Sequence, residues 1–325
     1  MRFVVFGAGG VGGVVGARLA QHGHDVALIA RGKHYEAIRR DRGLSLASPD
    51  EVVRLDLPVF DSPGQVTWTI DDVVLLAMKT QDTPAALDHL AAVAPAHIPI
   101  ICMQNGVANE RIALRRFANV YGVTVYCAAG HLTPGVVQAW FAPISGILDI
   151  GRYPSGVDEV ADMVAAAFRA STFDSTTSGD IMRWKYRKLL MNLGNAVDAL
   201  CGSAARASSI VSVARREGID CLNAAGIAFI PEEDETARGR ERSLQMRPID
   251  GRRRGGGSTW QSFERRTHRV ETDYLNGEIA LLGRLHGVPV PVNELLQRLT
   301  RQAALEGKPP GSMKVEEIES MLSGL

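Results

Sequence analysis

A lysine and two asparagines recur at helical spacing in the second half of the chain. Lys188, Asn192 and Asn195 are separated by four and then three residues, so an α-helix would place them on one face. A lysine can hold or donate a proton in catalysis, and asparagine is a poor helix-interior residue unless its amide has a partner. From spacing alone, a polar site and a solvated surface stripe are equally good interpretations.

Further polar residues follow at a distance. Ser258 opens a helical pattern that leads to Glu271, Asp273 and Asn276. Ser258 could simply cap its helix, and Glu271 could be an ordinary exposed carboxylate. Asn105, in Gln104-Asn105-Gly106, follows a strand pattern, and ligands bind at the carboxyl ends of strands in open α/β sheets. An isolated Asn-Gly turn would be an ordinary loop.

Glycines follow the first strand pattern of the chain. Gly7, Gly9 and Gly12 fit G-x-G-x-x-G between a strand and a helix, which is the context that a dinucleotide-binding loop requires. Gly7 permits the tight turn, Gly9 lets the backbone approach a pyrophosphate, and Gly12 lets the helix pack closely on the strand. The helix that begins at Gly10 presents free amide groups to that pyrophosphate. A glycine-rich turn without a cofactor is the weaker interpretation.

The end of the second strand carries Arg31 where NAD-binding folds place an acidic residue. A carboxylate there, roughly 20 residues past the glycines, would hold the ribose hydroxyls. Arg31 is followed by Lys33 and His34, a basic group that suits a 2′-phosphate, and the arginine fork can hold phosphate bidentately. We therefore expect NADPH/NADP as the cofactor, although Arg31 could also lie at a solvated strand end.

These residues must be positioned by two kinds of structure. The first half alternates apolar runs with helical patterns, as βα units of a parallel sheet do. The predicted strands are 2–6, 25–30, 73–78, 99–103 and 120–126, and the predicted helices are 10–21, 33–40, 83–94 and 107–117. Residues 131–153 are rich in Gly, Pro and β-branched residues, which predicts extra strands that close the first domain.

The second half is predicted to be helical, with long helices over 180–205, 208–229 and 258–287 and a shorter one near the end. A Ser, Thr and Gly cluster marks the boundary. The fold class is therefore α/β, with an N-terminal Rossmann-type dinucleotide-binding domain (1–178) followed by an all-α C-terminal domain (179–325) that binds substrate. Residues 231–257, which contain an arginine and glycine cluster, are interpreted as a solvated, mobile loop rather than a nucleic-acid site.

Composition narrows the classes of partner. The 36 Lys and Arg residues balance 36 Asp and Glu residues, so no net field attracts nucleic acid or an anionic membrane. The four cysteines form no CxxC pair and lack histidines at metal-ligand spacing, so we expect no metal site and reduced thiols.

The apolar runs are too short to span a bilayer, and the N-terminus enters a strand pattern at once. We expect a cytoplasmic protein with a small-molecule partner, and a homodimer stays open.

Together these motifs resemble the ketopantoate reductase (2-dehydropantoate 2-reductase) family over essentially the whole chain. The matching residues are Gly7, Gly9, Gly12, Arg31, Lys79, Gln104, Asn105, Gly106, Lys188, Asn192, Ser258 and Glu271. The resemblance implies a Rossmann domain and a helical domain with the active site between them. It also implies reduction of 2-dehydropantoate to (R)-pantoate with NADPH, a step in pantothenate and coenzyme A biosynthesis.

The resemblance assigns a role to each residue. Lys188 would polarise the keto oxygen and supply its proton, with Lys185 as the fallback lysine. Asn192 and Ser258 would bind substrate, and Glu271 would hold the substrate hydroxyl. Asn105 would lie by nicotinamide and substrate, and Lys79 would contact the cofactor. A cation at the carbonyl stabilises the negative charge that hydride transfer builds on oxygen.

The chain departs from the family pattern around the substrate. Ala196 stands where a second asparagine is common, with Asn195 one residue earlier as its candidate replacement. The interval from Ser258 to Glu271 is one residue longer than usual, and the loop over 231–257 is extended. Reduction of another small 2-oxo acid or functionalised ketone is therefore the main alternative. A non-catalytic NADP-binding sensor would not need Lys188.

Overall fold

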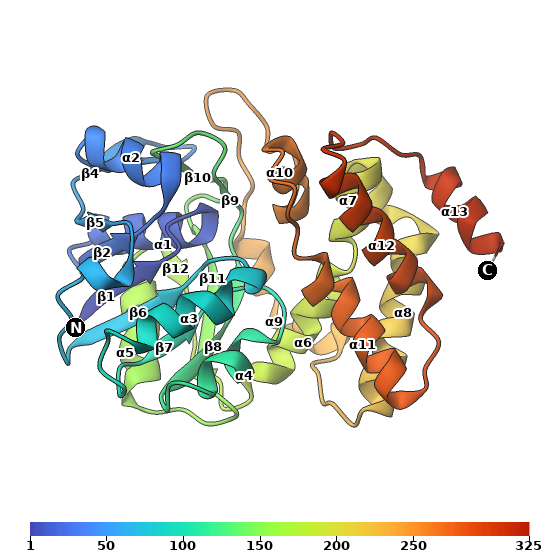
Figure 1. Cartoon of the computed structure of the whole chain (residues 1–325), viewed down its shortest axis with the longest axis horizontal. Helices are drawn as coiled ribbons and strands as arrows, with labels where there is room; N and C mark the ends of the chain where they lie inside the picture. Colours follow the sequence, from blue (N-terminus) through green and yellow to red (C-terminus); the bar gives the residue numbers. More distant parts are fainter. Residues whose placement is uncertain (325) are drawn as a thin grey trace. The chain divides into compact units, whose positions relative to one another are not determined.

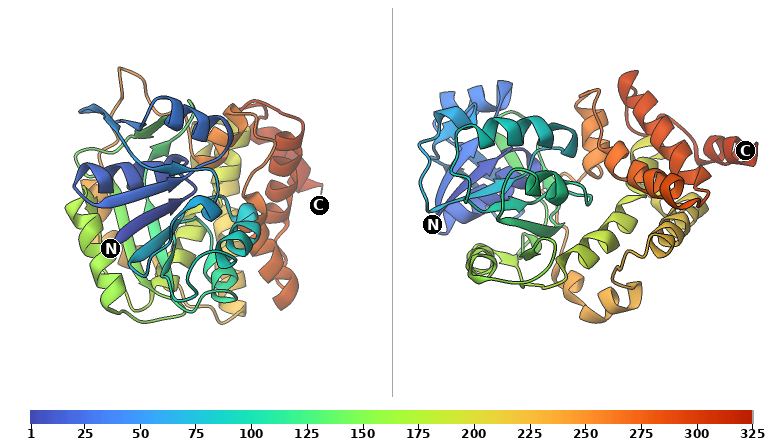
Figure 2. Two further views of the ribbon diagram at one scale, coloured as in Figure 1. Left: turned by 60° about the vertical axis from the view of Figure 1, so that its left-hand side comes forward. Right: turned by 60° about the horizontal axis from the view of Figure 1, so that its bottom comes forward.

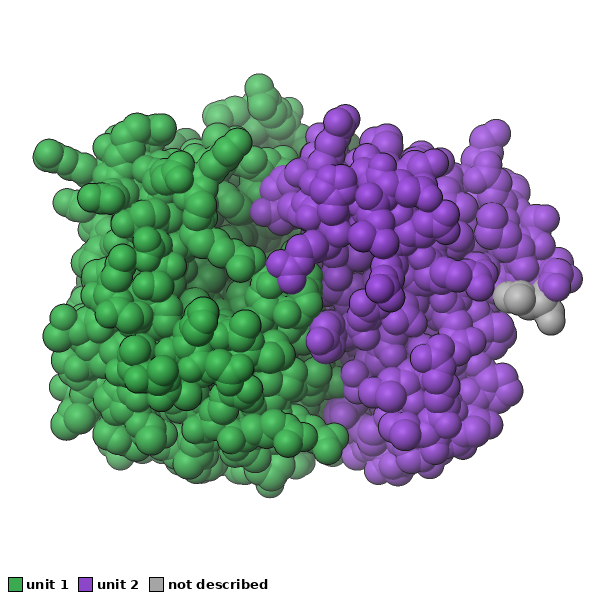
Figure 3. Space-filling model, viewed as in Figure 1, with its two compact units in different colours: residues 1–185, 233–254 green, residues 186–232, 255–325 purple. Residues whose placement is uncertain are grey.

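The structure, a computed structural model, describes residues 1–324. The chain forms two compact units, drawn in green and purple in Figure 3. Unit 1 consists of Met1–Lys185 and Glu233–Arg254, and unit 2 of Tyr186–Glu232 and the residues from Gly255 onward. The units therefore differ from the predicted division at 178/179. The first change of unit falls after Lys185, inside a helix, and a later segment returns to unit 1.

Unit 1 is built on an eight-stranded sheet with the order β12-β11-β8-β7-β6-β1-β2-β5. Its strands are β1 (Arg2–Phe6), β2 (Asp25–Ile29), β5 (Val59–Phe60), β6 (Asp72–Leu76), β7 (Ile100–Cys102), β8 (Val120–Tyr126), β11 (Gly146–Arg152) and β12 (Phe173–Asp174). The strands from β8 to β5 are parallel, and β11 is antiparallel to β8. The chain order reverses between β1 and β6, and ligands bind at the carboxyl ends of strands at such a point.

Helices cover both faces of this sheet (Figures 1 and 2). In β6, Val73 and Leu75 belong to the core cluster that includes helices α1 (Gly10–Gln21) and α5 (Glu159–Ala170). Val74 and Leu76 belong to the cluster that includes helices α3 (Thr83–Ala91) and α4 (Asn109–Leu114). This alternation follows from the two-residue period of a strand, and it explains why the buried parallel strands are continuously apolar.

A smaller sheet with the order β4-β3-β10-β9 adjoins α1 in unit 1. Its strands are β3 (Leu44–Ala47), β4 (Val52–Leu55), β9 (Ala129–Gly130) and β10 (Val136–Ala139). The prediction of extra strands within 131–153 is confirmed by β10 and β11. Strands β3, β4 and β5, which are short and follow α2 (Gly32–Arg40), were not predicted from the sequence.

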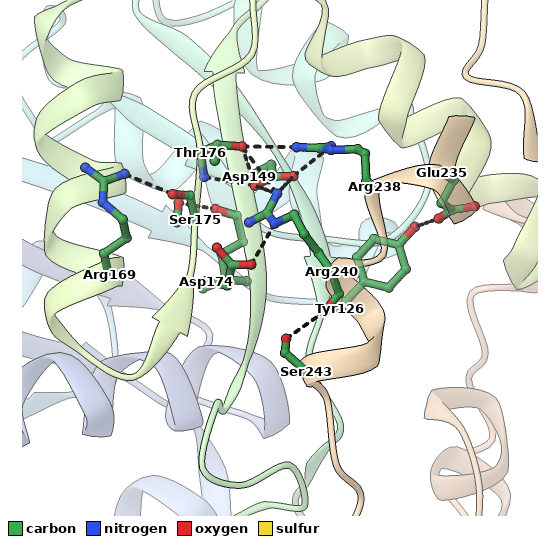
Figure 4. A network of polar contacts seen from close by, with 11 residues as sticks. Tyr126, Asp149, Arg169, Asp174, Ser175, Thr176, Glu235, Arg238, Arg240 and Ser243 are labelled. Carbon is green, nitrogen blue, oxygen red and sulfur yellow. Dashed lines mark hydrogen bonds and ion pairs between the residues drawn. The ribbon is translucent and has the colours of Figure 1, made fainter. Parts of the chain in front are cut away.

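The segment Glu233–Arg254 is part of unit 1, although it follows the first stretch of unit 2 in the sequence, and we call it the returning segment. Arg240 Nη1 donates to both carboxylate oxygens of buried Asp149 at 2.8 Å, and Arg240 Nε donates to Asp174 at 2.6 Å (Figure 4). The Arg238 guanidinium lies 4.1 Å from the centre of the Trp184 ring. The segment contains most of α9 (Glu232–Arg238) and the 3-10 turn η4 (Arg240–Ser243). The prediction of a loop is therefore wrong for the first part of this segment, because Arg238 and Arg240 pair with carboxylates that lie far away in the sequence, whereas Arg252 and Arg253 of the arginine and glycine cluster are exposed.

Unit 2 is helical, as predicted, but its helices are shorter than the sequence pattern suggested. They are α7 (Asn195–Cys201), α8 (Ser209–Ala224), α10 (Ser258–Glu264), α11 (Asn276–His286), α12 (Pro291–Leu305) and α13 (Val315–Ser323). Helix α6 (Ile181–Asn192) begins in unit 1 and ends in unit 2. Leu222, Ile279 and Leu296 form part of the core that α8, α11 and α12 share.

Two predicted helices are interrupted for local reasons. The helix predicted over 180–205 stops at Asn192 and resumes at Asn195, with Leu193 and Gly194 as a turn between them. The helix predicted over 258–287 breaks after Glu264, where Arg266 and His268 both have positive φ angles, 49° and 53°. Such left-handed residues cannot continue a right-handed helix.

Candidate active site

The glycine loop follows β1 at the carboxyl edge of the sheet. Gly7 has a φ of 103°, which favours glycine, and its amide and that of Ala8 donate to the Ile29 carbonyl at 3.0 and 3.2 Å. The Gly9 amide then turns back to the Gly7 carbonyl at 2.8 Å. These bonds hold the loop against β2 and direct the following amides into α1.

The space around each glycine fits the roles expected from the motif. A Cβ at Gly7 would lie 2.6 Å from the Met78 nitrogen, and one at Gly12 would lie 2.7 Å from the Ala77 side chain and collide with the Gly7 carbonyl. A Cβ at Gly9 would meet no described atom within 4 Å. Gly7 and Gly12 therefore serve close packing, whereas Gly9 leaves open space beside the N-terminus of α1. That space suits a pyrophosphate, which would accept hydrogen bonds from the first amides of the helix.

Gly10 has a different environment from the other three glycines. A Cβ there would make only ordinary contact with Ala129, at 3.6 Å. Its contribution to a cofactor site would come from its position as the first residue of α1, where amide groups lack partners within the helix.

Arg31 lies at the carboxyl end of β2 as the N-cap residue of α2, with its side chain 75% exposed. Its Nη2 is 2.6 Å from Asp82 Oδ2, at the end of the 3-10 turn η2 (Thr80–Asp82). Lys79 is the residue before that turn. Exposed ion pairs contribute little, so the Arg31 guanidinium can exchange its carboxylate partner for a phosphate at low cost.

His34 does not join this basic group, contrary to the expectation from its place in the sequence. Its ring is buried, with Nε2 2.7 Å from the Ala8 carbonyl and Nδ1 accepting from the Gly135 amide at 2.9 Å. Since a carbonyl only accepts and an amide only donates, Nε2 carries the proton and the ring is neutral. His34 therefore holds the glycine loop and leaves Arg31 and Lys33 as the cations at this end of α2.

Asn105 lies in the turn that follows β7, where Gly106 has a φ of 79°. Buried Asn109 ties this turn to the residues after β6. Its amide nitrogen donates to the Asn105 carbonyl at 3.5 Å and to Thr80 Oγ1 at 3.1 Å, and its amide oxygen accepts from Thr83 at 2.8 Å. These roles of Asn109, Thr80 and Thr83 were not predicted, since nothing in the spacing of the three residues reveals their hydrogen bonds.

The two candidate lysines of α6 have different environments. Lys185 is buried, and its Nζ lies 2.8 Å from Glu110 Oε1, 3.0 Å from the Gln104 carbonyl and 3.2 Å from the Val123 carbonyl. Lys188, one turn later, is partly exposed and shares its side of the helix with buried Asn192. Leu189, Leu190 and Leu193 of the same segment are buried. Lys188 is therefore the more accessible of the two lysines, whereas Lys185 is enclosed by its partners in unit 1.

Asn195 begins α7 rather than ending the face of α6, so the expected continuous face from Lys188 to Asn195 is broken by the Leu193–Gly194 turn. Its amide oxygen accepts from Arg206 at 2.7 Å. Arg206 also donates to buried Asp198 at 3.2 Å. Asp198 in turn accepts from the Gly257 amide at 2.8 Å.

Ser258 directly follows Gly257 and is the first residue of α10. The helix cap is Gly257, so the capping role considered for Ser258 does not apply. The Asp198 and Arg206 network links Asn195 to the residue before Ser258. Glu271 lies on a separate element as the N-cap residue of the 3-10 turn η5 (Thr272–Tyr274).

Asn276, one of the polar residues near Glu271, has a structural role. It is buried, and its amide nitrogen donates to the Leu193 carbonyl at 3.2 Å and to Asn293 at 3.0 Å. Asn293 in turn donates to Glu217 at 2.8 Å. This network satisfies the backbone where α6 gives way to α7.

The other predicted chemistries concern thiols and metals. All four cysteines are free, and burial raises the pKa of the Cys127 thiol to about 12, so this thiol stays protonated at neutral pH. Within residues 1–324, no cluster of His, Cys, Asp or Glu side chains is arranged to hold a metal ion. Over the same range, no helix has the length and apolar character to cross a bilayer.

A largely parallel sheet with an open glycine loop at its carboxyl edge, followed along the chain by a helical unit with a lysine and asparagine pair, is typical of dinucleotide-dependent proteins of two units. Residues 3–155 match the family model of ketopantoate reductase PanE/ApbA, and residues 180–304 match the model of its C-terminal part. The chain belongs to the ketopantoate reductase family, and it is an oxidoreductase of that family.

Similar proteins extend over nearly the whole chain. The 2-dehydropantoate 2-reductase of Pyrococcus horikoshii is 28% identical over 309 residues, which cover 93% of this chain and 97% of that protein. A PanE/ApbA family ketopantoate reductase from Ralstonia eutropha JMP134 has a TM-score of 0.76 at 26% identity, covering 94% of this chain and 99% of that one. D-mandelate dehydrogenase with NADH and anilino(oxo)acetate has a TM-score of 0.79 at 23% identity, with the same coverage, and it shares the fold.

Proposed function

We propose that this protein reduces 2-dehydropantoate to (R)-pantoate with NADPH, in the cytoplasmic synthesis of pantothenate and coenzyme A. The observation that carries the proposal is the pair on α6, where Lys188 is partly exposed one turn before Asn192 while Lys185 is buried on Glu110. The similarity to 2-dehydropantoate 2-reductases over at least 92% of this chain supports the choice of substrate.

The proposed chemistry divides between the two units. A nicotinamide dinucleotide supplies the hydride when it is bound, and unit 1 would hold it through the glycine loop, Lys79 and Asn105. Lys188 of unit 2 would stabilise the developing alkoxide through its ammonium group and deliver the proton. Asn192, Asn195 and Ser258 would bind the substrate, and Glu271 would accept a hydrogen bond from its hydroxyl.

NADPH is proposed over NADH because of the residues at the end of β2. No carboxylate occupies the position that binds ribose hydroxyls in NAD-specific folds. Arg31 is 75% exposed there and makes only an exposed ion pair with Asp82. A guanidinium so placed can bind a 2′-phosphate through charge-assisted hydrogen bonds.

The alternative is reduction of another small 2-oxo acid or functionalised ketone. The fold is shared with D-mandelate dehydrogenase, whose structure contains NADH and anilino(oxo)acetate, and a fold does not determine a substrate. The departures from the family pattern, Ala196 with Asn195 before it, also lie where selectivity is made.

Steady-state kinetics with a panel of keto acids and both nicotinamide cofactors tests the proposal. We expect the highest kcat/KM with 2-dehydropantoate and NADPH. A negligible kcat/KM for 2-dehydropantoate beside a high value for another keto acid would establish the alternative. A protein that binds NADPH but reduces no keto acid would be a sensor, and the proposal would be wrong.

A further inference from the structure

The buried ion pair of Lys185 and Glu110 is a polar feature of unit 1 that the proposed reaction does not use. The Lys185 side chain is 2% exposed and the Glu110 side chain is fully buried. An ammonium has three N–H donors, and Lys185 Nζ has three acceptors within 3.2 Å, namely Glu110 Oε1 and the carbonyls of Gln104 and Val123. Lys185 Nζ thus donates hydrogen bonds to two backbone carbonyls and forms an ion pair with Glu110, whose buried carboxylate oxygens accept no hydrogen bond.

The partners of Lys185 belong to different elements. Glu110 is in the first turn of α4, and Val123 is in the middle of β8. Gln104 immediately precedes Asn105, so its carbonyl is part of the turn that carries the proposed nicotinamide and substrate residue. Lys185 itself is in the first half of α6, and Lys188 follows three residues later on the same helix. A single ammonium group thus ties the Asn105 turn to the helix that carries Lys188.

The neighbouring backbone makes room for this pair. A Cβ at Gly122 of β8 would lie 3.2 Å from Lys185 Cδ and 3.3 Å from Glu110 Oε1, so a larger residue there would press on both side chains. Burial of two charges costs desolvation, and apolar residues of similar volume are often at least as stabilising. A buried pair is therefore weak evidence for stability alone, and a role in geometry accounts for its charges better.

We propose that Lys185 and Glu110 are positioning residues for the reaction, which together hold the Asn105 turn and the start of α6 in the arrangement that catalysis needs. This inference rests on the proposed function. Lys185 acts through the Gln104 carbonyl on Asn105 and through one turn of α6 on Lys188. Misplacement of reacting groups by about 1 Å can cost roughly 100-fold in rate, so a small shift in either residue lowers kcat.

The test uses the double variant Lys185→Met/Glu110→Gln, which removes both charges and leaves no unpaired charge in the core. We expect kcat with 2-dehydropantoate to fall at least about 10-fold, whereas the KM for NADPH should change less, because the glycine loop and Lys79 also hold the cofactor and are untouched. A folded double variant with the kcat of the parent would overturn the proposal.

The control is another ion pair of unit 1, between Arg2, whose side chain is 24% exposed, and Asp72. Arg2 Nε and Nη2 donate to the Asp72 carboxylate at 2.7 and 2.8 Å, and Asp72 is fully buried. Both residues begin their strands, β1 and β6, at the edge opposite to the glycine loop. The variant Arg2→Met/Asp72→Asn should lower the melting temperature and leave kcat and KM unchanged. An equal loss of kcat in this control would mean that loss of any ion pair of unit 1 slows the enzyme, and would overturn the proposal.

A second variant tests the proposal if the double variant folds poorly, and hydrogen exchange tests it if the parent protein shows no activity. Gly122→Ala keeps both charges and presses on Lys185 Cδ and Glu110 Oε1, and we expect a smaller fall in kcat than in the double variant. Hydrogen exchange should be faster than in the parent at the amides of 104–106 and around Lys188, and unchanged there in the control. Unchanged exchange at those amides would overturn the proposal. Failure of the proposed function appears in the parent kinetics, whereas failure of this inference appears only in the variants.

Discussion

The proposed cofactor site of unit 1 consists mainly of backbone, whereas the proposed substrate residues of unit 2 are side chains on separate helices. In unit 1, the absence of a Cβ at Gly7 and Gly12 lets strand and helix approach, and Gly9 leaves open space. In unit 2, Asn195 and Ser258 are linked through Asp198, Arg206 and Gly257. The backbone site should be sensitive to the size of a substituted residue, and the side-chain site to its chemical type.

The largest effect is expected from Lys188→Met, which removes the ammonium group and keeps much of the side-chain volume. General acid catalysis contributes about 10²–10⁴-fold, so kcat should fall within that range, while the Kd for NADPH from fluorescence titration should not change. Lys308→Met, at an exposed lysine of unit 2, serves as the control. Retention of more than a tenth of the parent kcat would remove Lys188 from its proposed role.

Gly12→Ala tests the steric side of the comparison. The added methyl group would collide with the Gly7 carbonyl and lie 2.7 Å from the Ala77 side chain, and overpacking of this kind costs about 1–3 kcal/mol. We expect a lower free energy of unfolding in urea and weaker NADPH binding. Gly64→Ala is the matched control, since a Cβ there meets no atom within 4 Å. Equal behaviour of the two variants would show that the loop tolerates a side chain.

Arg31→Ala tests the one side chain on which the choice of cofactor depends. Hydrogen bonds to charged groups contribute about 1.5–3 kcal/mol, so the KM for NADPH should rise roughly 10- to 100-fold and the KM for NADH should change little. Arg39→Ala, at an exposed position of the same helix, should leave both values unchanged. An equal rise for both cofactors would contradict the assignment of NADPH.

The smallest effect is expected in the returning segment, which lies in neither proposed site. The hydrogen bond from Arg240 lowers the pKa of the Asp174 carboxyl below its ordinary value of 3.8. The stabilisation is therefore present above pH 3.8 and is lost as the pH falls through the lowered pKa. Asp174→Asn should reduce the free energy of unfolding by less than about 1 kcal/mol at pH 7, with unchanged kcat. Urea unfolding at pH 7 and pH 3 should show the difference between variant and parent shrinking in acid, and a constant difference would exclude this ion pair as its cause.

Much of unit 1 could be predicted because its signals are local. The bounds predicted for the first helix, 10–21, agree with α1, and the five strands predicted in the first half each correspond to a strand of the large sheet. Short strands such as β3 and β4 were missed, because a few residues carry too little periodicity to identify a strand.

The sequence predicted which residues belong to the candidate site better than it predicted their contacts and backbone conformations. The glycines, Arg31 and Lys188 are visible because their types and spacing are constrained by the chemistry that they could perform. The neutral ring of His34 on the glycine loop, the break between Asn192 and Asn195, and the Gly257 cap before Ser258 were not visible. Each depends on a partner that lies far along the chain or on a local backbone conformation.

By itself, the sequence determined the α/β and helical halves, the glycine loop and the residues available for chemistry, since apolar period and glycine placement act over a few neighbouring residues. Only the tertiary structure decided that Lys185 is buried on Glu110, that Arg240 binds Asp149, and that a segment of the second half belongs to unit 1. The physical reason is that a charged side chain is stable in the interior only beside its counterion. That counterion can lie at any separation along the sequence, so local sequence patterns do not reveal the pair.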